Sequence, residues 1–239
     1  MPVYALTEDI FFPPPQLANP EGILAVGGDL RPERLLLAYH MGIFPWYSEY
    51  EPIVWWSPDP RCVLETAQLK VSKSMRQILR RNQFQVSFDQ AFGTVIQECR
   101  KIKRKGQHGT WITDEMEEAY CSLHDMGFAH SVEVWENEQL VGGLYGVSVG
   151  RCFFGESMFS RVSNASKTGF ITLVKHLQKA GFNWIDCQIY NDHLGSLGAS
   201  EISREAFLRR LADDIKQDTL QGNWETLLKA ETQGSGLGE

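Results

Sequence analysis

The chain has 239 residues, of which 43% are hydrophobic and 22% charged, and it carries a formal net charge of −7. This ordinary composition excludes collagen-like, coiled-coil and disordered proteins, and a chain of this length buries a sizeable core without a metal or disulfide staple. No apolar run approaches the ~20 residues of a membrane-spanning helix and the N-terminus shows no basic, apolar leader, so we expect a soluble, cytoplasmic protein.

The prolines divide the chain, because all ten lie between Pro2 and Pro60. Proline fixes φ and donates no backbone hydrogen bond, so it favours turns and irregular loops over sheet ladders. We therefore expect a small, loop-rich N-terminal domain over residues 1–61. A larger domain of regular structure is expected over residues 62–231, followed by a disordered, glycine-rich tail over residues 232–239.

Two helices are predicted in the first half of the chain. Residues 34–39 form a short helix, with Pro32 in its first turn and Gly42 just past its end. Residues 70–81 form a second helix with one apolar and one basic face. The apolar face holds Val71, Met75, Ile78 and Leu79, and the basic face holds Lys70, Lys73, Arg76, Arg80 and Arg81.

Positive charge is concentrated around this second helix. Residues 70–105 contain ten Lys or Arg against Asp89 and Glu98, a net charge of +8, so the rest of the chain carries −15. A solvated helix face explains such a pattern as readily as a ligand does. The additional basic run from Arg100 to Lys105, in an otherwise acidic protein, favours a polyanion partner, and an RNA over bulk DNA.

The second half of the chain alternates between strand and helix patterns. An antiparallel meander is predicted over residues 130–159, with a turn at Asn137. A helix capped by Asn164 or Ser166 follows, and then a strand over residues 184–190. Because hairpin, helix and strand follow one another in this order, we expect an α+β fold.

Three segments of the sequence have either a structural or a functional interpretation. With a period of two, Asp186 and Gln188 point to the same face of the last strand, where they need partners or serve a ligand. Glu156 lies among aromatic and Met side chains, either ion-paired in the core or at a pocket. The run from Trp55 to Arg61 is interpreted as a rigid wedge between domains in preference to a base-stacking platform.

The sequence contains no GxxxxGK[ST] phosphate loop and no GxGxxG loop after a strand. Its five cysteines form no CxxC pair, and its six histidines do not cluster with them at zinc-ligand spacing. We therefore expect reduced, mostly buried thiols, no metal site and no cofactor.

Nine segments, in one order along the chain, resemble the bacterial leucyl/phenylalanyl-tRNA–protein transferases. The resemblance extends from about Gly22 to Leu208. Any one segment is weak evidence, but nine in the same order are specific. They are Gly27–Leu30, Gly42–Trp46, Trp55–Arg61, Gly109–Ile112, His130–Trp135, Gly142–Gly146, Gly155–Ser160, Asn164–Lys167 and Asp186–Gln188.

This resemblance implies a reaction and a fold. Such enzymes move Leu, Phe and, less readily, Met from Leu-tRNA or Phe-tRNA to the α-amine of a protein's N-terminal Arg or Lys. The new peptide bond creates a destabilising N-terminus that marks the protein for degradation. The larger domain is expected to resemble the acyl-CoA N-acyltransferase (GNAT-like) fold, although residues 161–166 lack the glycines of its CoA-binding loop. The ester is already activated, so neither CoA nor another cofactor is expected, and the enzyme is expected to be a monomer.

The resemblance also implies roles for residues of this sequence. Gln188 is expected at the reacting amine, with Asp186 orienting and polarising it, and these two form the implied catalytic pair. Glu156 and Asp186 are the acidic candidates for recognising a basic acceptor N-terminus. The implied tRNA contacts are those of the basic helix face, namely Lys70, Lys73, Arg76, Arg80 and Arg81.

The donor is expected to occupy an apolar slot next to an aromatic platform. Trp46, Trp111 and Tyr120 are implied to pack around the terminal adenosine of the tRNA. Glu156 is placed near the mouth of the slot, and Asn191 is also implied in substrate binding. The slot itself is assigned to Leu144, Phe153, Met158 and Ile185.

Two other functions compete with this interpretation. A cell-wall aminoacyltransferase uses the same donor and a similar fold, but it is typically longer, with a doubled domain and a helical arm. A non-catalytic tRNA-binding protein would explain the basic patch. It would leave the polar face with Asp186 and Gln188 without a purpose.

Overall fold

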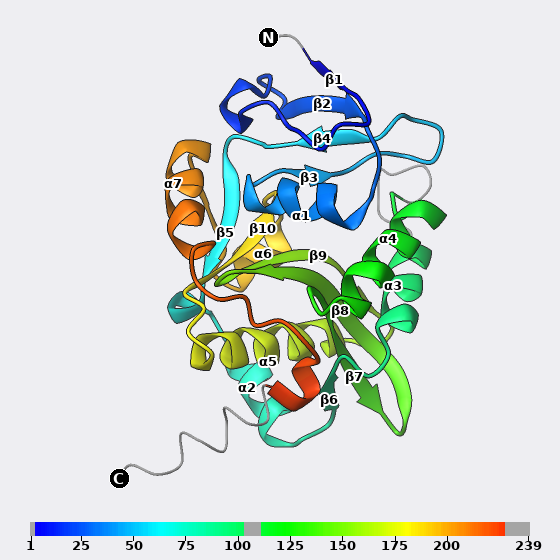
Figure 1. Ribbon diagram of the computed structural model, residues 1–239. Helices are drawn as coiled ribbons and strands as arrows, with labels where there is room; N and C mark the ends of the chain where they lie inside the picture. The colour runs from blue at the N-terminus through cyan, green and yellow to red at the C-terminus, as the bar shows by residue number, and fades with distance from the viewer. Residues whose placement is uncertain (1–2, 103–110, 228–239) are drawn as a thin grey trace.

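The computed structural model describes residues 3–102 and 111–227. These residues form two sheets, a four-stranded one in the order β1-β2-β4-β3 and a seven-stranded one in the order β11-β5-β10-β9-β8-β7-β6. The small sheet lies at the N-terminal end of the molecule and the large sheet runs through its centre (Figure 1). The strands of the small sheet are β1 (Tyr4–Leu6), β2 (Ile23–Gly27), β3 (Phe44–Pro45) and β4 (Val54–Trp56).

The large sheet is antiparallel except where β9 and β10 pair in parallel. Helix α5 connects these two strands, as a parallel connection requires. Its strands are β5 (Arg61–Glu65), β6 (Gln85–Phe88), β7 (Ala129–Glu136), β8 (Gln139–Val149), β9 (Cys152–Ser160), β10 (Trp184–Gln188) and β11 (Ser200–Ile202).

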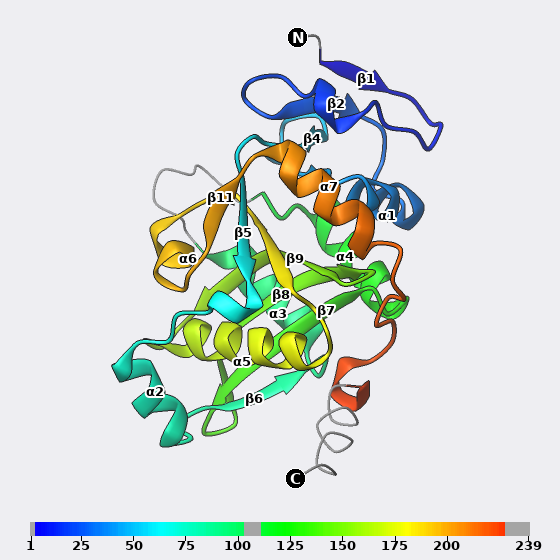
Figure 2. The same ribbon diagram turned by 90° about the vertical axis from the view of Figure 1, so that its left-hand side faces the viewer.

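Helices cover both faces of the large sheet. Helix α5 packs across one face, with α2 beside it, while α3 and α4 cover the other (Figures 1 and 2). The helices are α1 (Pro32–His40), α2 (Lys73–Arg80), α3 (Phe92–Lys101), α4 (Asp114–Asp125), α5 (Ala165–Lys179), α6 (Asp192–Ser196) and α7 (Arg204–Asp214), with short 3-10 turns at Pro15–Leu17 and Thr66–Gln68. Within the described part of the chain, every helix is too short or too polar to span a bilayer.

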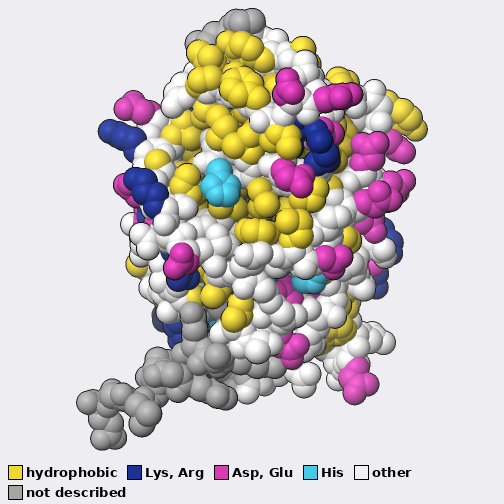
Figure 3. Space-filling view, in the orientation of Figure 1, with side chains coloured by type: hydrophobic (Ala, Val, Ile, Leu, Met, Phe, Trp, Pro, Cys, Tyr) yellow, Lys and Arg dark blue, Asp and Glu magenta, His cyan; other side chains and the backbone are white. Residues whose placement is uncertain are grey.

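Consecutive side chains along a strand point to opposite faces of the sheet, so they belong to different apolar cores. Phe153 packs in the core under α5, whereas Phe154 packs in the core under α3 and α4. The second core continues into the N-terminal sheet, where Trp55 is fully buried. The two sheets therefore share one apolar interior, while other hydrophobic side chains gather on the surface of the N-terminal sheet (Figure 3).

The predicted α+β class and the meander are confirmed. The turn lies at Asn137 and Glu138, which both have positive φ, and a second turn lies at Gly150. The helix expected over residues 70–81 starts only at Lys73, because Ser72 caps it by accepting a hydrogen bond from the Met75 amide. Its expected apolar face is confirmed, since Met75 is buried in the core under α5.

Candidate active site

Two β-bulges face each other where β9 and β10 separate. The parallel pairing consists of Ile185 with Phe153 and Asp186 with Phe154, and it ends there. On β9, Glu156 is the extra residue between pairs with β8, and on β10 Cys187 is the extra residue between pairs with β5. A bulge bends its strand and re-aims the side chains next to it. The divergence of the strands opens a space between them.

A cavity of about 410 Å³ occupies this space. That volume is within the range of small-molecule sites in proteins, roughly 300–1,000 Å³. Its walls come from β3, β8, β9, α5, β10 and the turn into α6. The lining residues are Phe44, Pro45, Trp46, Trp111, Leu144, Tyr145, Phe153, Gly155, Glu156, Ser157, Met158, Phe170, Ile185, Cys187, Gln188, Ile189, Tyr190, Asn191, His193 and Leu194.

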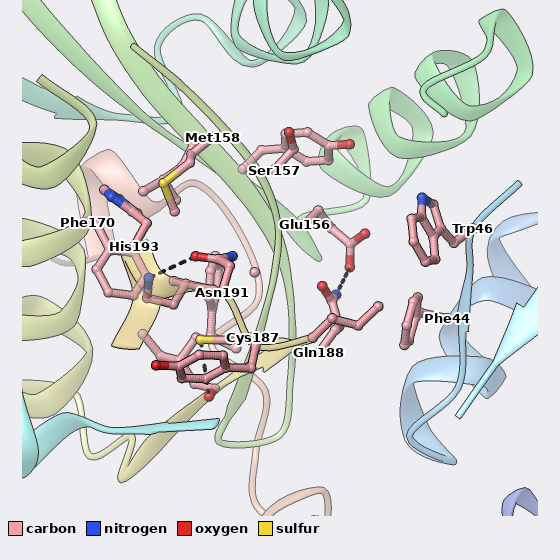
Figure 4. A pocket seen from close by; sticks show the side chains of 18 of the residues that line it. Phe44, Trp46, Glu156, Ser157, Met158, Phe170, Cys187, Gln188, Asn191 and His193 are labelled. Atoms are coloured by element: carbon pink, nitrogen blue, oxygen red, sulfur yellow. Dashed lines mark hydrogen bonds between the residues drawn. The ribbon is translucent and has the colours of Figure 1, made fainter. Parts of the chain in front are cut away.

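The cavity has an apolar end and an aromatic end with a polar pair between them. Figure 4 shows Met158 and Phe170 on one side of the Glu156–Gln188 pair and Phe44 and Trp46 on the other. The apolar end contains all four residues predicted for the donor slot, Leu144, Phe153, Met158 and Ile185. A ligand with an apolar group at one end and an aromatic ring at the other fits this arrangement.

Glu156 is held by three hydrogen-bond donors. The Tyr39 hydroxyl donates to Oε1 at 2.8 Å, the Tyr120 hydroxyl donates to Oε2 at 3.2 Å, and the Gln188 amide donates to Oε1 at 2.9 Å. Burial raises the pKa of Glu156 to about 7, although these donors oppose the shift. Burial also raises the pKa of both tyrosines well above its usual value, so both stay neutral donors. A carboxyl group with this pKa exchanges its proton near neutrality.

The side-chain amide of Gln188 has a defined orientation. Because an ionised carboxylate only accepts hydrogen bonds, the nitrogen of the amide must face Glu156. The carbonyl oxygen Oε1 is then the atom that Gln188 offers to a ligand in the cavity. It can accept a hydrogen bond from an amine there.

Asp186 forms a buried ion pair with Arg61 behind the cavity. The Arg61 Nε donates to Oδ1 at 2.8 Å and its Nη2 donates to Oδ2 at 2.6 Å. Both side chains are at most 1% exposed. The backbone amide of Gln188 donates to Asp186 Oδ1 at 2.9 Å. This bond holds Gln188 at a φ of +57°, in the left-handed region that residues with a Cβ seldom adopt.

Three sequence-based expectations need correction. Asp186 and Gln188 do not share a face, because the bulge at Cys187 breaks the alternation and only Gln188 lines the cavity. Tyr120 is fully buried behind Glu156, so it has no surface on which an adenine base stacks. The strand expected to reach Tyr190 ends at Gln188, which leaves Ile189 exposed at the rim.

The aromatic end of the cavity rests on the tryptophan-rich run. Trp46 and Trp111 line it, and their packing around the terminal adenosine stays a prediction. The Trp56 indole donates to the Trp46 carbonyl at 2.7 Å, and the two indole rings lie 5.5 Å apart. Trp55 is fully buried and its indole donates to the Gly27 carbonyl at 2.9 Å. Trp55 therefore supports the scaffold and offers no face on which a base could stack, while Trp56 braces a cavity wall.

Asn191 both lines the cavity and caps a helix. It lines the cavity, and its side chain caps α6 by accepting a hydrogen bond from the Leu194 amide at 2.9 Å. The next turn of chain brings His193 and Leu194 to the same wall. The cap thus fixes the backbone that closes the apolar end.

The basic residues of the chain occupy two different environments. Lys70, Lys73, Arg76, Arg80 and Arg81 are all exposed, on and beside α2. By contrast, Arg100 pairs with Asp114 and Glu117, and Lys101 pairs with Glu98. Residues 103–105 of the same basic run lie outside the described residues. Among the described basic residues of segment 70–105, those on and beside α2 are therefore the ones that remain open to an anion.

Sequence reasoning missed several residues of the site. Tyr39 and Arg61 come from α1 and β5, far along the chain from the residues that they hold, and no spacing pattern connects them. Phe170, from α5, adds to the apolar end. Residues 146–150 read GVSVG and match the GxSxG pattern of hydrolase nucleophiles. Residues 146–149 lie within β8 and Ser148 is fully buried, which excludes that role.

Comparisons with known proteins identify the family of this chain. The sequence model "Leucyl/phenylalanyl-tRNA protein transferase" matches residues 63–212, and the model of that family's N-terminal domain matches residues 28–59. A leucyl/phenylalanyl-tRNA–protein transferase of Flavobacterium johnsoniae is 59% identical over 206 residues, 86% of this chain and 97% of the relative. Those of Syntrophus aciditrophicus and Syntrophobacter fumaroxidans are 56% and 55% identical, covering 95% and 94% of this chain and 95% and 96% of the relatives.

A similar solved structure, a functionally unknown conserved protein from Staphylococcus epidermidis, is 8% identical with a TM-score of 0.43. The match covers 76% of this chain and 68% of the Staphylococcus chain, and a likeness at this level assigns neither a fold nor a function. The matches to the family models and to the relatives confirm the resemblance seen in the nine segments. The chain belongs to the leucyl/phenylalanyl-tRNA–protein transferase family.

Proposed function

We propose that this protein transfers Leu or Phe, and less readily Met, from aminoacyl-tRNA to the α-amine of a protein that begins with Arg or Lys. The observation that carries the proposal is the cavity between β9 and β10. It joins an apolar end to the Glu156–Gln188 pair, and the aromatic end lies beyond the pair. Family membership supports the same reaction.

In the proposed complex the donor spans the cavity. The apolar end, with Leu144, Phe153 and Met158, takes the leucyl or phenylalanyl side chain. Trp46 and Trp111 pack against the terminal adenosine at the aromatic end. The ester bond between amino acid and ribose then lies beside Glu156 and Gln188. A pocket of apolar walls discriminates side chains that differ by one methylene by only ~1–3 kcal/mol, so use of both Leu and Phe is reasonable.

The reaction joins an amine to an activated ester. The amine nitrogen attacks the ester carbonyl carbon, the bond from that carbon to the ribose oxygen breaks, and the proton lost by the amine balances the proton gained by the ribose oxygen. We place Gln188 Oε1 as the acceptor that orients the attacking N–H. Glu156, with its pKa near 7, accepts the proton as the carbon–nitrogen bond forms.

Asp186 has a different role in this proposal. Because it is buried and paired with Arg61, it touches neither the amine nor the acceptor's basic side chain. It is a positioning residue that fixes the backbone of Gln188. Glu156 remains the acidic group that faces the cavity and attracts a basic acceptor N-terminus.

We also propose that the large sheet has the acyl-CoA N-acyltransferase topology and that the chain divides near residue 61. The diverging parallel pair β9/β10 with its α5 crossover supports the first point. The switch from the small sheet to the large one at β5 supports the second. We further propose a monomer, and the aminoacyl-tRNA donor places the reaction in the cytoplasm.

Transfer of labelled Phe from Phe-tRNA tests the proposed function. The acceptors are two peptides that differ only in starting with Arg or Ala, and neither ATP nor CoA is added. We expect label on the Arg peptide alone, because the ester supplies the driving force and the site requires a basic terminus. Salt-sensitive binding of Phe-tRNA without any transfer would contradict the proposal and support a non-catalytic tRNA-binding protein.

The exposed face of α2 gives a second prediction. Replacing Lys73, Arg76 and Arg80 with Ala is expected to weaken tRNA binding. The slope of log K against log[salt] is expected to become shallower by about 1 for each lost phosphate contact. Arg209→Ala, at an exposed position on α7, is the matched control. Equilibrium binding of Phe-tRNA at several salt concentrations checks this, and equal slopes for all proteins would rule out α2 as the contact.

A further inference from the structure

A segment after α7 returns to the face of the sheet on which α5 packs (Figures 1 and 2). We call residues 219–227 the C-terminal strap. The Gly150 amide donates to the Thr219 hydroxyl at 2.8 Å, and the Gly222 amide donates to the Gly127 carbonyl at 3.1 Å. The contact is close enough that a Cβ on Gly127 would lie 2.5 Å from the Gly222 nitrogen. The strap is therefore fixed to the ends of the sheet strands.

Trp224 is the residue that the strap inserts into the core. It is fully buried, and its backbone amide donates to Asp89 Oδ2 at 2.8 Å. The same carboxylate accepts from His130 Nδ1 at 2.9 Å and from the Ser131 amide at 2.8 Å. The His130 ring stacks on the Trp224 indole, with centroids 3.8 Å apart and planes within 8°. Burial lowers the pKa of His130, so it stacks as a neutral ring.

Trp224 also packs against Phe153, a wall of the cavity. Their ring centroids lie 5.6 Å apart. Phe153 also lies over Gly146 of β8, where a Cβ would come within 2.5 Å of the Phe153 Cζ. The Phe153 ring thus contacts both Gly146, which has no side chain, and the indole of Trp224, which is not among the residues that line the cavity.

We propose that Trp224 is a positioning residue that sets the depth of the apolar end, and with it the preference between phenylalanyl and leucyl donors. This inference rests on the proposed function. Interiors are close-packed, so removing the indole leaves a void into which the Phe153 ring relaxes. A deeper pocket loses contacts with the shorter leucyl side chain and accommodates the longer phenylalanyl one. Trp224 lies outside residues 28–59 and 63–212, which the family models match.

The test measures the ratio of Phe to Leu transferred when Phe-tRNA and Leu-tRNA compete for an Arg-initiated peptide. Trp224→Ala is expected to raise this ratio about tenfold, within the range that one or two methylene groups provide in an apolar pocket. Trp224→Phe is expected to raise it less, and decides the question if Trp224→Ala does not fold. Both transfers come from one enzyme sample, so the folded fraction cancels from the ratio.

Trp184→Phe is the matched control. Trp184 is also fully buried and its indole also donates a hydrogen bond, but it packs on Phe207 of α7, away from the cavity. We expect this variant to lose stability and keep the unaltered ratio. The inference is overturned if the Trp224 variants transfer Phe and Leu in the same ratio as the unaltered protein. It is also overturned if Trp184→Phe shifts this ratio as much as the Trp224 variants do. Absence of any transfer by the unaltered chain would instead overturn the proposed function, and this inference with it.

Discussion

Asp186→Ala is expected to lower the free energy of unfolding by about 3–5 kcal/mol, because it leaves the Arg61 guanidinium buried without a partner. Arg61 also donates to the Gly42 carbonyl and lies over the rings of Phe44 and Phe207, but none of these neutralises its charge. The loss is measured by chemical denaturation.

The same substitution is expected to reduce transfer at least 10²-fold in the protein that remains folded. Asp186 Oδ1 is the acceptor that holds the Gln188 amide, and Gln188 adopts a φ of +57°. Without this bond the backbone is free to relax toward negative φ, and the Gln188 side chain leaves its place beside Glu156. A misplacement of about 1 Å in a positioning group costs on the order of 10²-fold in rate.

A double variant separates stability from positioning. Replacing Arg61 with Met and Asp186 with Leu removes both charges and fills the space with apolar groups, a change that is often neutral for stability. We expect Arg61→Met/Asp186→Leu to recover most of the folding free energy and to remain as slow as Asp186→Ala. Recovery of transfer together with stability would show that the anchor on Gln188 is dispensable. Full turnover by Asp186→Ala itself would refute its role outright.

Glu156→Gln has the second large effect. We expect transfer at pH 8 to fall about 10²-fold, because a neutral amide accepts no proton from the attacking amine. Gln keeps the size of the side chain, but it keeps an oxygen at only one of the two positions that accept from the Tyr39 and Tyr120 hydroxyls. Tyr39→Phe is a useful companion, since it removes one donor and leaves the carboxylate in place.

The substitution also changes the dependence of stability on pH. Burial raises the pKa of Glu156 from 4.5 to about 7, so between these values the folded protein binds a proton that the unfolded chain releases. Stability of the unaltered protein therefore falls as pH rises from 4.5 to 7, by on the order of 2 kcal/mol. The stability of Glu156→Gln does not fall in this way as pH rises. Thermal unfolding of both proteins at pH 5 and pH 8 measures the difference between their pH dependences.

Much of the scaffold follows from local patterns. The meander was predictable because residues 131–135 alternate between polar and apolar side chains and turn residues separate the strand-like runs of residues 130–159. The apolar slot followed from family resemblance, and the cavity brings Leu144, Phe153, Met158 and Ile185 together. The α2 helix was predictable from its two faces, although its cap at Ser72 made it start later than expected.

The polar centre could not be predicted in the same way, because it depends on two bulges. A period of two places Asp186 and Gln188 on one face, whereas the extra residue Cys187 turns Gln188 into the cavity and leaves Asp186 behind it. Likewise, Glu156 is the extra residue of its strand, and its donors Tyr39 and Tyr120 come from helices 117 and 36 residues away. Long-range contacts of this kind leave no spacing in the sequence.

The measurement that tests the central claim most directly is the single-turnover rate of Phe transfer to an Arg-initiated peptide between pH 5.5 and 8.5. The α-amine of a peptide ordinarily has a pKa of ~7.7–8.0 and Glu156 has a pKa of about 7, so both must lose a proton for reaction. We predict that the logarithm of the rate falls with a slope approaching two below pH 7 in the unaltered protein, and with a slope of one in Glu156→Gln. A slope of one in both proteins, with equal rates at pH 8, would contradict the assignment of Glu156 as the group that receives the amine's proton.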